Sequence, residues 1–181
     1  FIHGALCVSV SGECLMSALE EVRSGNRGTC AQYCRMKYRV LRNGKYLDSN
    51  GPFLLSTKEL NTSHHIKELM NSNITSFKIE GRMKSKEYVG FITHFYRRFM
   101  DDKSMQVKKE EEKKLKTIFN RDFTDGYLFQ NKNIMNFETA NHLGYPIGSV
   151  IAYDSKKIKI KLTECIHQED GIKFLPSDLG M

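Results

Sequence analysis

The sequence lacks any long hydrophobic segment and any recognisable secretory signal. No run approaches the roughly 18 consecutive apolar residues that a membrane-spanning helix requires, and no basic segment followed by an apolar stretch and a cleavage site opens the chain. These absences exclude a transmembrane class and predict a protein of the reducing cytoplasm with no membrane partner. In that compartment cysteines persist as thiols rather than as disulfides.

Two common hydrolase patterns are also missing. The adjacent His64 and His65 do not have the i, i+4 spacing of a zinc-binding His-Glu-x-x-His helix, and no Gly-x-Ser-x-Gly nucleophile turn occurs. Peptidase activity is therefore the less favoured enzyme class. The sequence also has no initiator methionine, and it opens at Phe1 inside an apolar, strand-like run. We therefore expect these 181 residues to be the later part of a longer protein, with one or two domains present.

The distribution of the cysteines is informative. Of five cysteines, Cys7, Cys14, Cys30 and Cys34 fall within the first 34 residues, spaced C-x6-C, then x15, then C-x3-C. Thiolates are soft ligands for zinc or iron, and this spacing differs from the paired C-x2-C or C-x4-C knuckles of zinc sites. An iron–sulfur cluster is the favoured interpretation, with structural thiols and a redox disulfide as alternatives. Cys165 stands apart and is expected to be a buried small hydrophobe.

Two blocks of residues accompany these thiols. They are His3-Gly4-Ala5-Leu6-Cys7, Ser11-Gly12-Glu13-Cys14-Leu15-Met16-Ser17 and Asn26-Arg27-Gly28-Thr29-Cys30-Ala31-Gln32 with Cys34-Arg35, and, downstream, Phe77-Lys78-Ile79-Glu80-Gly81-Arg82-Met83-Lys84-Ser85. Together they resemble the signature of the U32, or collagenase-like, peptidase family. Residues 123–129 and 141–144 are similar to the region that follows the barrel in the same family.

The resemblance implies more than proteolysis, because some branches of the family resemble oxygen-independent hydroxylases that hold a [4Fe–4S] cluster on four cysteines. It therefore implies Cys7, Cys14, Cys30 and Cys34 as cluster ligands and prephenate as the oxygen donor. The branch nearest in pattern hydroxylates tRNA uridine, so the implied partners are tRNA or another structured RNA and a paralogous U32 subunit. The alternatives are a collagenase-like hydrolase, a ribosomal RNA hydroxylase and a non-enzymatic RNA-binding protein with a structural cluster.

Acidic residues are absent between Arg23 and Lys45, although the chain carries a net charge of only +7. Cations combined with aromatic rings suit phosphate neutralisation and base stacking on RNA. The residues expected to contact RNA are Arg23, Arg27, Arg35, Lys37, Arg39, Arg42, Tyr33 and Tyr38, with Tyr46 also interleaved. The alternative is a solvated basic surface with the tyrosines packed inward.

Glu80 and Arg82 are the candidate catalytic residues. They follow a short predicted strand and precede a predicted helix, which in a (β/α) barrel is the rim where active sites are assembled. Glu80 could exchange protons, and Arg82 could bind a carboxylate through a bidentate fork. The alternative is an internal ion pair of Glu80 with Arg82 or Lys84. His3 presents the same choice between a substrate contact and a core histidine, and the core is favoured.

Hydrophobic periodicity predicts an α/β fold: the C-terminal part of a (β/α) barrel followed by a small, truncated β-barrel-like domain. We expect strands at 1–7 and 76–79, helices at 14–22, 63–70, 85–100 and 108–116, a hairpin in 38–56 around Asn43-Gly44, and later strands at 147–153, 157–162 and 171–174. The helix over 85–100 carries a core stripe of Tyr88, Val89, Ile92, Phe95, Tyr96 and Phe99. The expected division is barrel at 1–103, connector at 104–140 and β-domain at 141–181.

Overall fold

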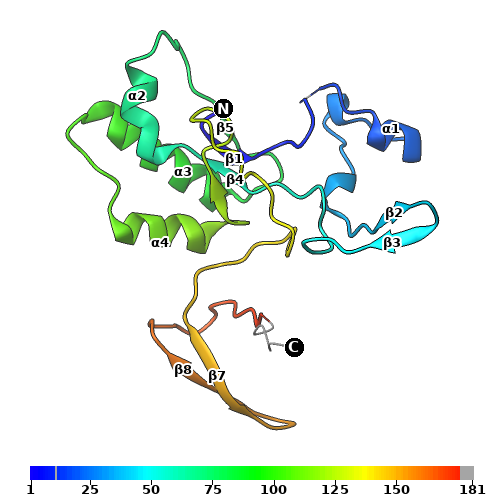
Figure 1. The fold of residues 1–181 in the computed structure, drawn as a ribbon. Helices are drawn as coiled ribbons and strands as arrows, with labels where there is room; N and C mark the ends of the chain where they lie inside the picture. The colour runs from blue at the N-terminus through cyan, green and yellow to red at the C-terminus, as the bar shows by residue number, and fades with distance from the viewer. Residues whose placement is uncertain (11, 176–181) are drawn as a thin grey trace. The chain divides into compact units, whose positions relative to one another are not determined.

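The computed structural model describes residues 1–10 and 12–175 (Figure 1). Ser11 of the family-like signature therefore lies outside the described residues, as do the last residues of the predicted β-domain. The chain separates into two compact units, Phe1–Leu143 and Gly144–Met181. The finer division into barrel, connector and β-domain stays a prediction. No helix among the described residues is long and apolar enough to cross a membrane.

The first unit is built on a short, mixed, four-stranded sheet in the order β5-β1-β4-β6. Its strands are β1 (His3–Ala5), β4 (Glu59–Asn61), β5 (Ile79–Glu80) and β6 (Phe123–Thr124). β1 is parallel to β5, and β4 is parallel to β6, but β1 and β4 are antiparallel. The α/β class is therefore confirmed, whereas the described residues contain no closed barrel. The predicted strand at 76–79 forms slightly later, at β5.

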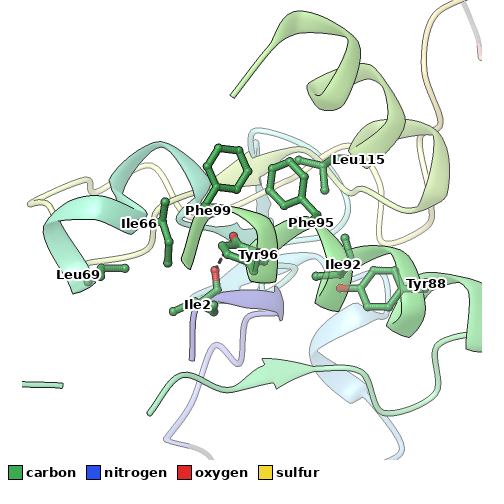
Figure 2. Close-up of a cluster of buried hydrophobic side chains, with 9 residues drawn as sticks. All are labelled: Ile2, Ile66, Leu69, Tyr88, Ile92, Phe95, Tyr96, Phe99 and Leu115. Carbon is green, nitrogen blue, oxygen red and sulfur yellow. Dashed lines mark hydrogen bonds between the residues drawn. The ribbon is translucent and has the colours of Figure 1, made fainter. Parts of the chain in front are cut away.

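The long helix α3 (Lys86–Asp101) supplies most of the core. It begins at the N-cap Ser85, whose hydroxyl accepts a hydrogen bond from the Tyr88 amide at 3.2 Å. The predicted stripe is confirmed except at Val89, which is 42% exposed. Figure 2 shows the stripe packed against Ile2, just before β1, and against side chains from α2 (Ile66–Met70) and α4 (Lys109–Ile118). The buried set is Ile2, Ile66, Leu69, Tyr88, Ile92, Phe95, Tyr96, Phe99 and Leu115.

His3 lies in this core, as favoured from the sequence. Its side chain is buried, and its Nδ1 lies 3.2 Å from the Tyr96 hydroxyl. Burial lowers the pKa of His3 to about 4; the hydrogen bond with Asn61 opposes this shift and the charge of Lys84 adds to it. The folded protein therefore holds a neutral imidazole at a pH where the unfolded chain is protonated.

This difference predicts a loss of stability in acid. Between pH 6.5 and 4 the unfolded state binds the proton that folded His3 does not, so the free energy of unfolding falls by roughly 3 kcal/mol by pH 4. Urea titrations at a series of pH values measure the slope, and His3→Gln serves as the reference without this group. Identical slopes for the two proteins in this window would contradict the assignment.

The segment between β1 and β4 consists of short elements. They are α1 (Met16–Glu20), 3-10 turns at Gly25–Arg27 and Tyr33–Arg35, and the hairpin of β2 (Val40–Arg42) and β3 (Lys45–Leu47). Asn43 and Gly44 both have positive φ, of 52° and 75°, as a tight primed turn requires. The predicted hairpin is thus confirmed. The predicted helix at 63–70 is a 3-10 turn at Ser63–His65 that continues into α2.

The second unit contains one antiparallel hairpin in its described part. β7 (Gly148–Tyr153) pairs with β8 (Ile158–Leu162), and the Asp154 side chain accepts hydrogen bonds from the Lys156 and Lys157 amides in the turn. The expected third strand at 171–174 is wrong, because these residues form no ladder. Cys165 is exposed rather than buried, so that prediction is also wrong.

Candidate functional site

The parallel neighbours β1 and β5 end at the same edge of the sheet. Cys7 follows β1 by two residues, and Glu80 closes β5. The two strands approach closely because position 4 is glycine: Gly4 has φ +115°, and a Cβ there would collide with the Glu80 carbonyl oxygen. The first cysteine and the Glu80 loop are therefore brought to one edge, as the sequence predicts for a strand–loop rim.

The four N-terminal cysteines are free thiols, with Cys7 exposed and the other three partly buried. Burial raises the pKa of Cys34, the neighbouring Arg35 opposes the shift, and the charges of Cys30, Cys7 and Cys14 add to it. Each of the other three thiols is thus close enough to Cys34 to be felt electrostatically.

The chemistry of the four thiols indicates which metal groups they would suit. Among the described residues, no three His, Cys, Asp or Glu side chains are placed to share a single metal ion. A zinc site needs all its sulfurs about 2.3 Å from one point, whereas a cubane cluster offers each thiolate a different iron and accepts wider separations. Four thiols within one segment are a donor set that would suit an iron–sulfur group, in which each thiolate binds a different iron.

Cys30 receives the best-defined support. Its Sγ accepts a hydrogen bond from the Gln32 amide at 3.3 Å and contacts the Ser17 hydroxyl at 3.8 Å. Ser17 is buried on α1 and also accepts from the Ala31 amide at 3.0 Å. Such donors fix the direction of the sulfur. Helix α1 therefore serves to hold the loop that carries Cys30.

Arg35, predicted to contact RNA, is partly buried, and its guanidinium is directed at the protein. Its guanidinium donates to Ser56 and Thr57 just before β4 and to the carbonyl oxygen of Leu6. Burial lowers the pKa of Arg35 to about 10, an effect to which Arg121 adds and which the nearby Cys34 charge opposes. The side chain is occupied within the protein.

The remaining members of the predicted RNA-binding set divide into two groups. Arg23 donates to the Thr29 carbonyl at 2.8 Å, and Tyr38 donates to the Tyr33 carbonyl at 2.8 Å, so these side chains brace the cysteine segment. Tyr33 donates in turn to Glu21 at 2.9 Å. Arg23 is itself exposed, and the other exposed cations of the set are Arg27, Lys37, Arg39 and Arg42. The last two lie at or next to the β2–β3 hairpin.

The hairpin is an open ribbon. Tyr46 is 67% exposed, the Arg39 guanidinium lies over its ring at 5.5 Å from the centroid, and Leu41 is its cross-strand partner. Every residue from 39 to 50 is exposed. In the sequence, Tyr46 was noted only as one of the tyrosines that alternate with the cations. In the structure, its ring is the most accessible of the basic run.

Among the described residues, the side chains of Glu80 and Arg82 form no ion pair with each other. Glu80 accepts from the backbone amide of Arg82 at 3.0 Å, so the carboxylate shapes its own loop. Arg82 is exposed, and its Nη1 lies 3.4 Å from the position that a Cβ on Gly28 would occupy. The Arg82 guanidinium therefore extends from the β5 edge to the segment between Cys14 and Cys30.

A buried charge cluster beside this edge was not found from the sequence. Glu59 on β4 is only 1% exposed and pairs with Arg121, while the Lys84 Nζ lies 3.9 Å from its Oε1. Burial lowers the pKa of Lys84 to about 8, Glu59 opposes the shift and Arg121 adds to it. Lys84 also lies over the Phe119 ring, 2.8 Å from its centroid. No sequence pattern links positions 59, 84 and 121.

Comparison with known proteins gives the family of the chain. A family model described as peptidase family U32 matches residues 1–137, and the chain belongs to that family. It is 41% identical over 132 residues to a collagenase of Porphyromonas gingivalis, a match covering 70% of this chain and 37% of that protein. It is also 37% identical over 180 residues to tRNA hydroxylation protein P of Helicobacter pylori, covering 90% of this chain and 43% of the relative.

A third relative, the 23S rRNA 5-hydroxycytidine C2501 synthase of Escherichia coli, is 33% identical over 187 residues, covering 97% of this chain and 29% of that protein. The chain thus spans less than half the length of these relatives. No solved structure gives a significant match.

Proposed function

We propose that the protein to which this chain belongs is an oxygen-independent RNA hydroxylase that modifies tRNA uridine and uses a [4Fe–4S] cluster. The observation that carries the proposal is a set of four free thiols, of which Cys7 follows β1 and Cys34 adjoins Arg35, whose guanidinium donates to the carbonyl of Leu6 next to Cys7; Cys14 and Cys30 complete the set. The relatives named for tRNA hydroxylation and for 5-hydroxycytidine synthesis match 90% and 97% of the chain, and these matches therefore extend into the second unit. The collagenase match covers 70%.

The four thiols would hold the cluster, which when bound supplies redox chemistry at the sheet edge. The residues around them have separable tasks. Hydrogen bonds from Ser17 and the Gln32 amide orient Cys30. Arg82 offers an exposed guanidinium next to the cysteine loop, which suits the carboxylates of an oxygen donor such as prephenate. Glu80 orders the backbone of that loop and is the nearest candidate for proton exchange.

RNA binding is assigned to the β2–β3 hairpin and its flanks. Lys37, Arg39, Arg42 and Lys45 supply positive charge, and the exposed Tyr46 ring supplies a stacking surface. Phosphate contacts give affinity for any RNA, while a ring that stacks on an unpaired base selects loops over duplex. A tRNA presents both features. The open ribbon therefore matches the substrate class of the proposed reaction.

A pair of substitutions tests this surface. Tyr46→Ala is expected to weaken tRNA binding by about 1–3 kcal/mol through lost stacking, and Arg39→Gln to reduce the salt dependence by about one phosphate contact. Fluorescence anisotropy of labelled tRNA with the full-length protein, repeated at several salt concentrations, measures both. Lys109→Gln removes the same charge from the exposed start of α4 and is the control. Equal losses in all three variants would contradict a localised RNA surface.

The proposed reaction is tested on the full-length protein purified without oxygen. About four irons and four sulfides per chain, together with hydroxylated uridine in tRNA by nucleoside mass spectrometry when the protein is supplied with prephenate, are expected. Iron without any modified nucleoside would favour a structural cluster in an RNA-binding protein. Peptide hydrolysis without iron would favour the collagenase-like alternative. Hydroxycytidine in ribosomal RNA would identify ribosomal RNA, instead of tRNA, as the substrate.

A further inference from the structure

We infer that Arg35 is the clamp that fixes the geometry of the cysteine site and sets the reduction potential of the group bound there. The inference rests on the proposed function in assigning a cluster to the four thiols. It goes beyond that function by giving Arg35 a role at the cysteine site, whereas the sequence analysis expected this side chain to contact RNA.

The clamp consists of one guanidinium with four acceptors. Its Nη1 donates to the Ser56 hydroxyl at 2.9 Å and to the Thr57 carbonyl, and its Nη2 donates to the Thr57 hydroxyl at 2.8 Å and to the Leu6 carbonyl at 3.1 Å. The Thr57 hydroxyl donates to the same Leu6 carbonyl. Ser56 and Thr57 have no measurable exposure, so these bonds are shielded from water.

The positions of these partners in the chain explain what is clamped. Leu6 precedes Cys7, and Arg35 follows Cys34. The Arg35 side chain therefore joins the backbone next to Cys7 to the residue next to Cys34. Through the same bonds, Leu6 and Arg35 are both joined to Ser56 and Thr57, which lead into β4. The relative position of Cys7 and Cys34 is therefore fixed by the guanidinium rather than by the loop of 26 residues between them.

Only arginine makes this set of bonds. A planar guanidinium presents several N–H groups in a fixed fork, whereas a lysine ammonium directs three donors from a single point. A lysine side chain in place of Arg35 would retain the charge but would lose at least one of the bonds to Leu6 or Ser56. A glutamine would retain two N–H donors but would remove the charge. The two substitutions therefore separate the contribution of geometry from the contribution of charge.

The charge has its own consequence for redox chemistry. A positive group in a partly buried site beside thiolate ligands favours the more negative, reduced state of an iron–sulfur group, because there is little water to screen it. Hydrogen-bonding partners outside the ligand set also affect loading, typically by 10–100-fold in metal affinity when they are removed. Arg35 combines both effects in one side chain.

The test compares Arg35→Gln and Arg35→Lys with the matched control Arg97→Gln, an exposed arginine on α3. In the anaerobic full-length protein, we expect Arg35→Gln to lower iron affinity by about 10–100-fold and to shift the midpoint potential to more negative values. Arg35→Lys should lose affinity with a smaller shift in potential. Chelator competition measures the affinity, and redox titration monitored by electron paramagnetic resonance measures the potential.

Other outcomes have equally definite meanings. Wild-type loading and potential in both Arg35 variants would overturn the inference. If circular dichroism shows that they do not fold, Thr57→Val replaces them, because it removes one acceptor and keeps the charge; it should weaken loading with little shift in potential, and unchanged loading would overturn the clamp. If the wild type itself binds no iron, the proposed function fails separately. Hydrogen–deuterium exchange at residues 6–9 and 30–36 then tests the clamp alone, and equal exchange in Arg35→Gln would overturn it.

Discussion

Cys14→Ala is expected to abolish iron binding and RNA hydroxylation of the full-length protein together. Cys14 lies in the middle of the cysteine segment, partly buried, and its thiol is one of the charges that act on Cys34. Removing it would leave one corner of a cubane cluster without a protein ligand. The loss should exceed the roughly 100-fold that removal of an outer hydrogen-bonding partner causes. Iron and sulfide analysis and nucleoside mass spectrometry on the same preparation measure both losses.

Cys165→Ala is the matched control for this prediction. Cys165 is an exposed thiol in the second unit, so its loss removes the same atom from a different surface. It should leave iron content and hydroxylation unchanged. Full activity in Cys14→Ala would remove the cluster from the mechanism, and loss of activity with full iron content would assign the thiol a role in chemistry rather than in ligation.

Glu59→Ala is expected to destabilise the first unit by about 3–5 kcal/mol, because it leaves the buried Arg121 and the largely buried Lys84 without their common carboxylate. Glu59 pairs with Arg121, whose side chain is only 6% exposed, and lies 3.9 Å from the Lys84 Nζ. Burying an unpaired charge costs more than a lost surface contact. Urea unfolding followed by tyrosine fluorescence reports the change through the midpoint and slope.

Glu110→Ala, at an exposed position near the start of α4, provides the comparison and should change stability by less than about 0.5 kcal/mol. A Glu59→Ala protein with an unfolding midpoint equal to that of Glu110→Ala would show that the two cations are solvated in solution. The same experiment on Glu59→Gln separates charge from shape, since glutamine retains the volume and one acceptor oxygen.

Local structure was predicted well where neighbouring residues in the sequence are enough to determine it. The α3 stripe follows from a 3.6-residue period, and the β2–β3 turn follows from Asn43-Gly44, because these residues adopt positive φ easily. Val89 was placed in the stripe and is exposed, since it lies at the margin of the apolar face. The third strand at 171–174 was predicted from alternation alone, and no partner strand pairs with it among the described residues.

Long-range partners were not predictable in the same way. The antiparallel pairing of β1 with β4 depends on strands more than 50 residues apart, and strands of two or three residues carry almost no pattern of their own. The basic run showed a similar limit. Its members have the same charge in the sequence, yet Arg35 is turned into the protein while Arg39 stays at the surface.

Residue identity and spacing along the chain were enough to define the family, the four candidate ligands and the basic character of the segment around them. Folding was needed to establish which cations of the basic run are exposed, that Arg35 donates to Leu6, Ser56 and Thr57, and that Glu59, Lys84 and Arg121 meet in one buried cluster. Burial and hydrogen-bond geometry depend on segments that are distant in the chain and come together only in the folded protein. Spacing along the chain does not encode them.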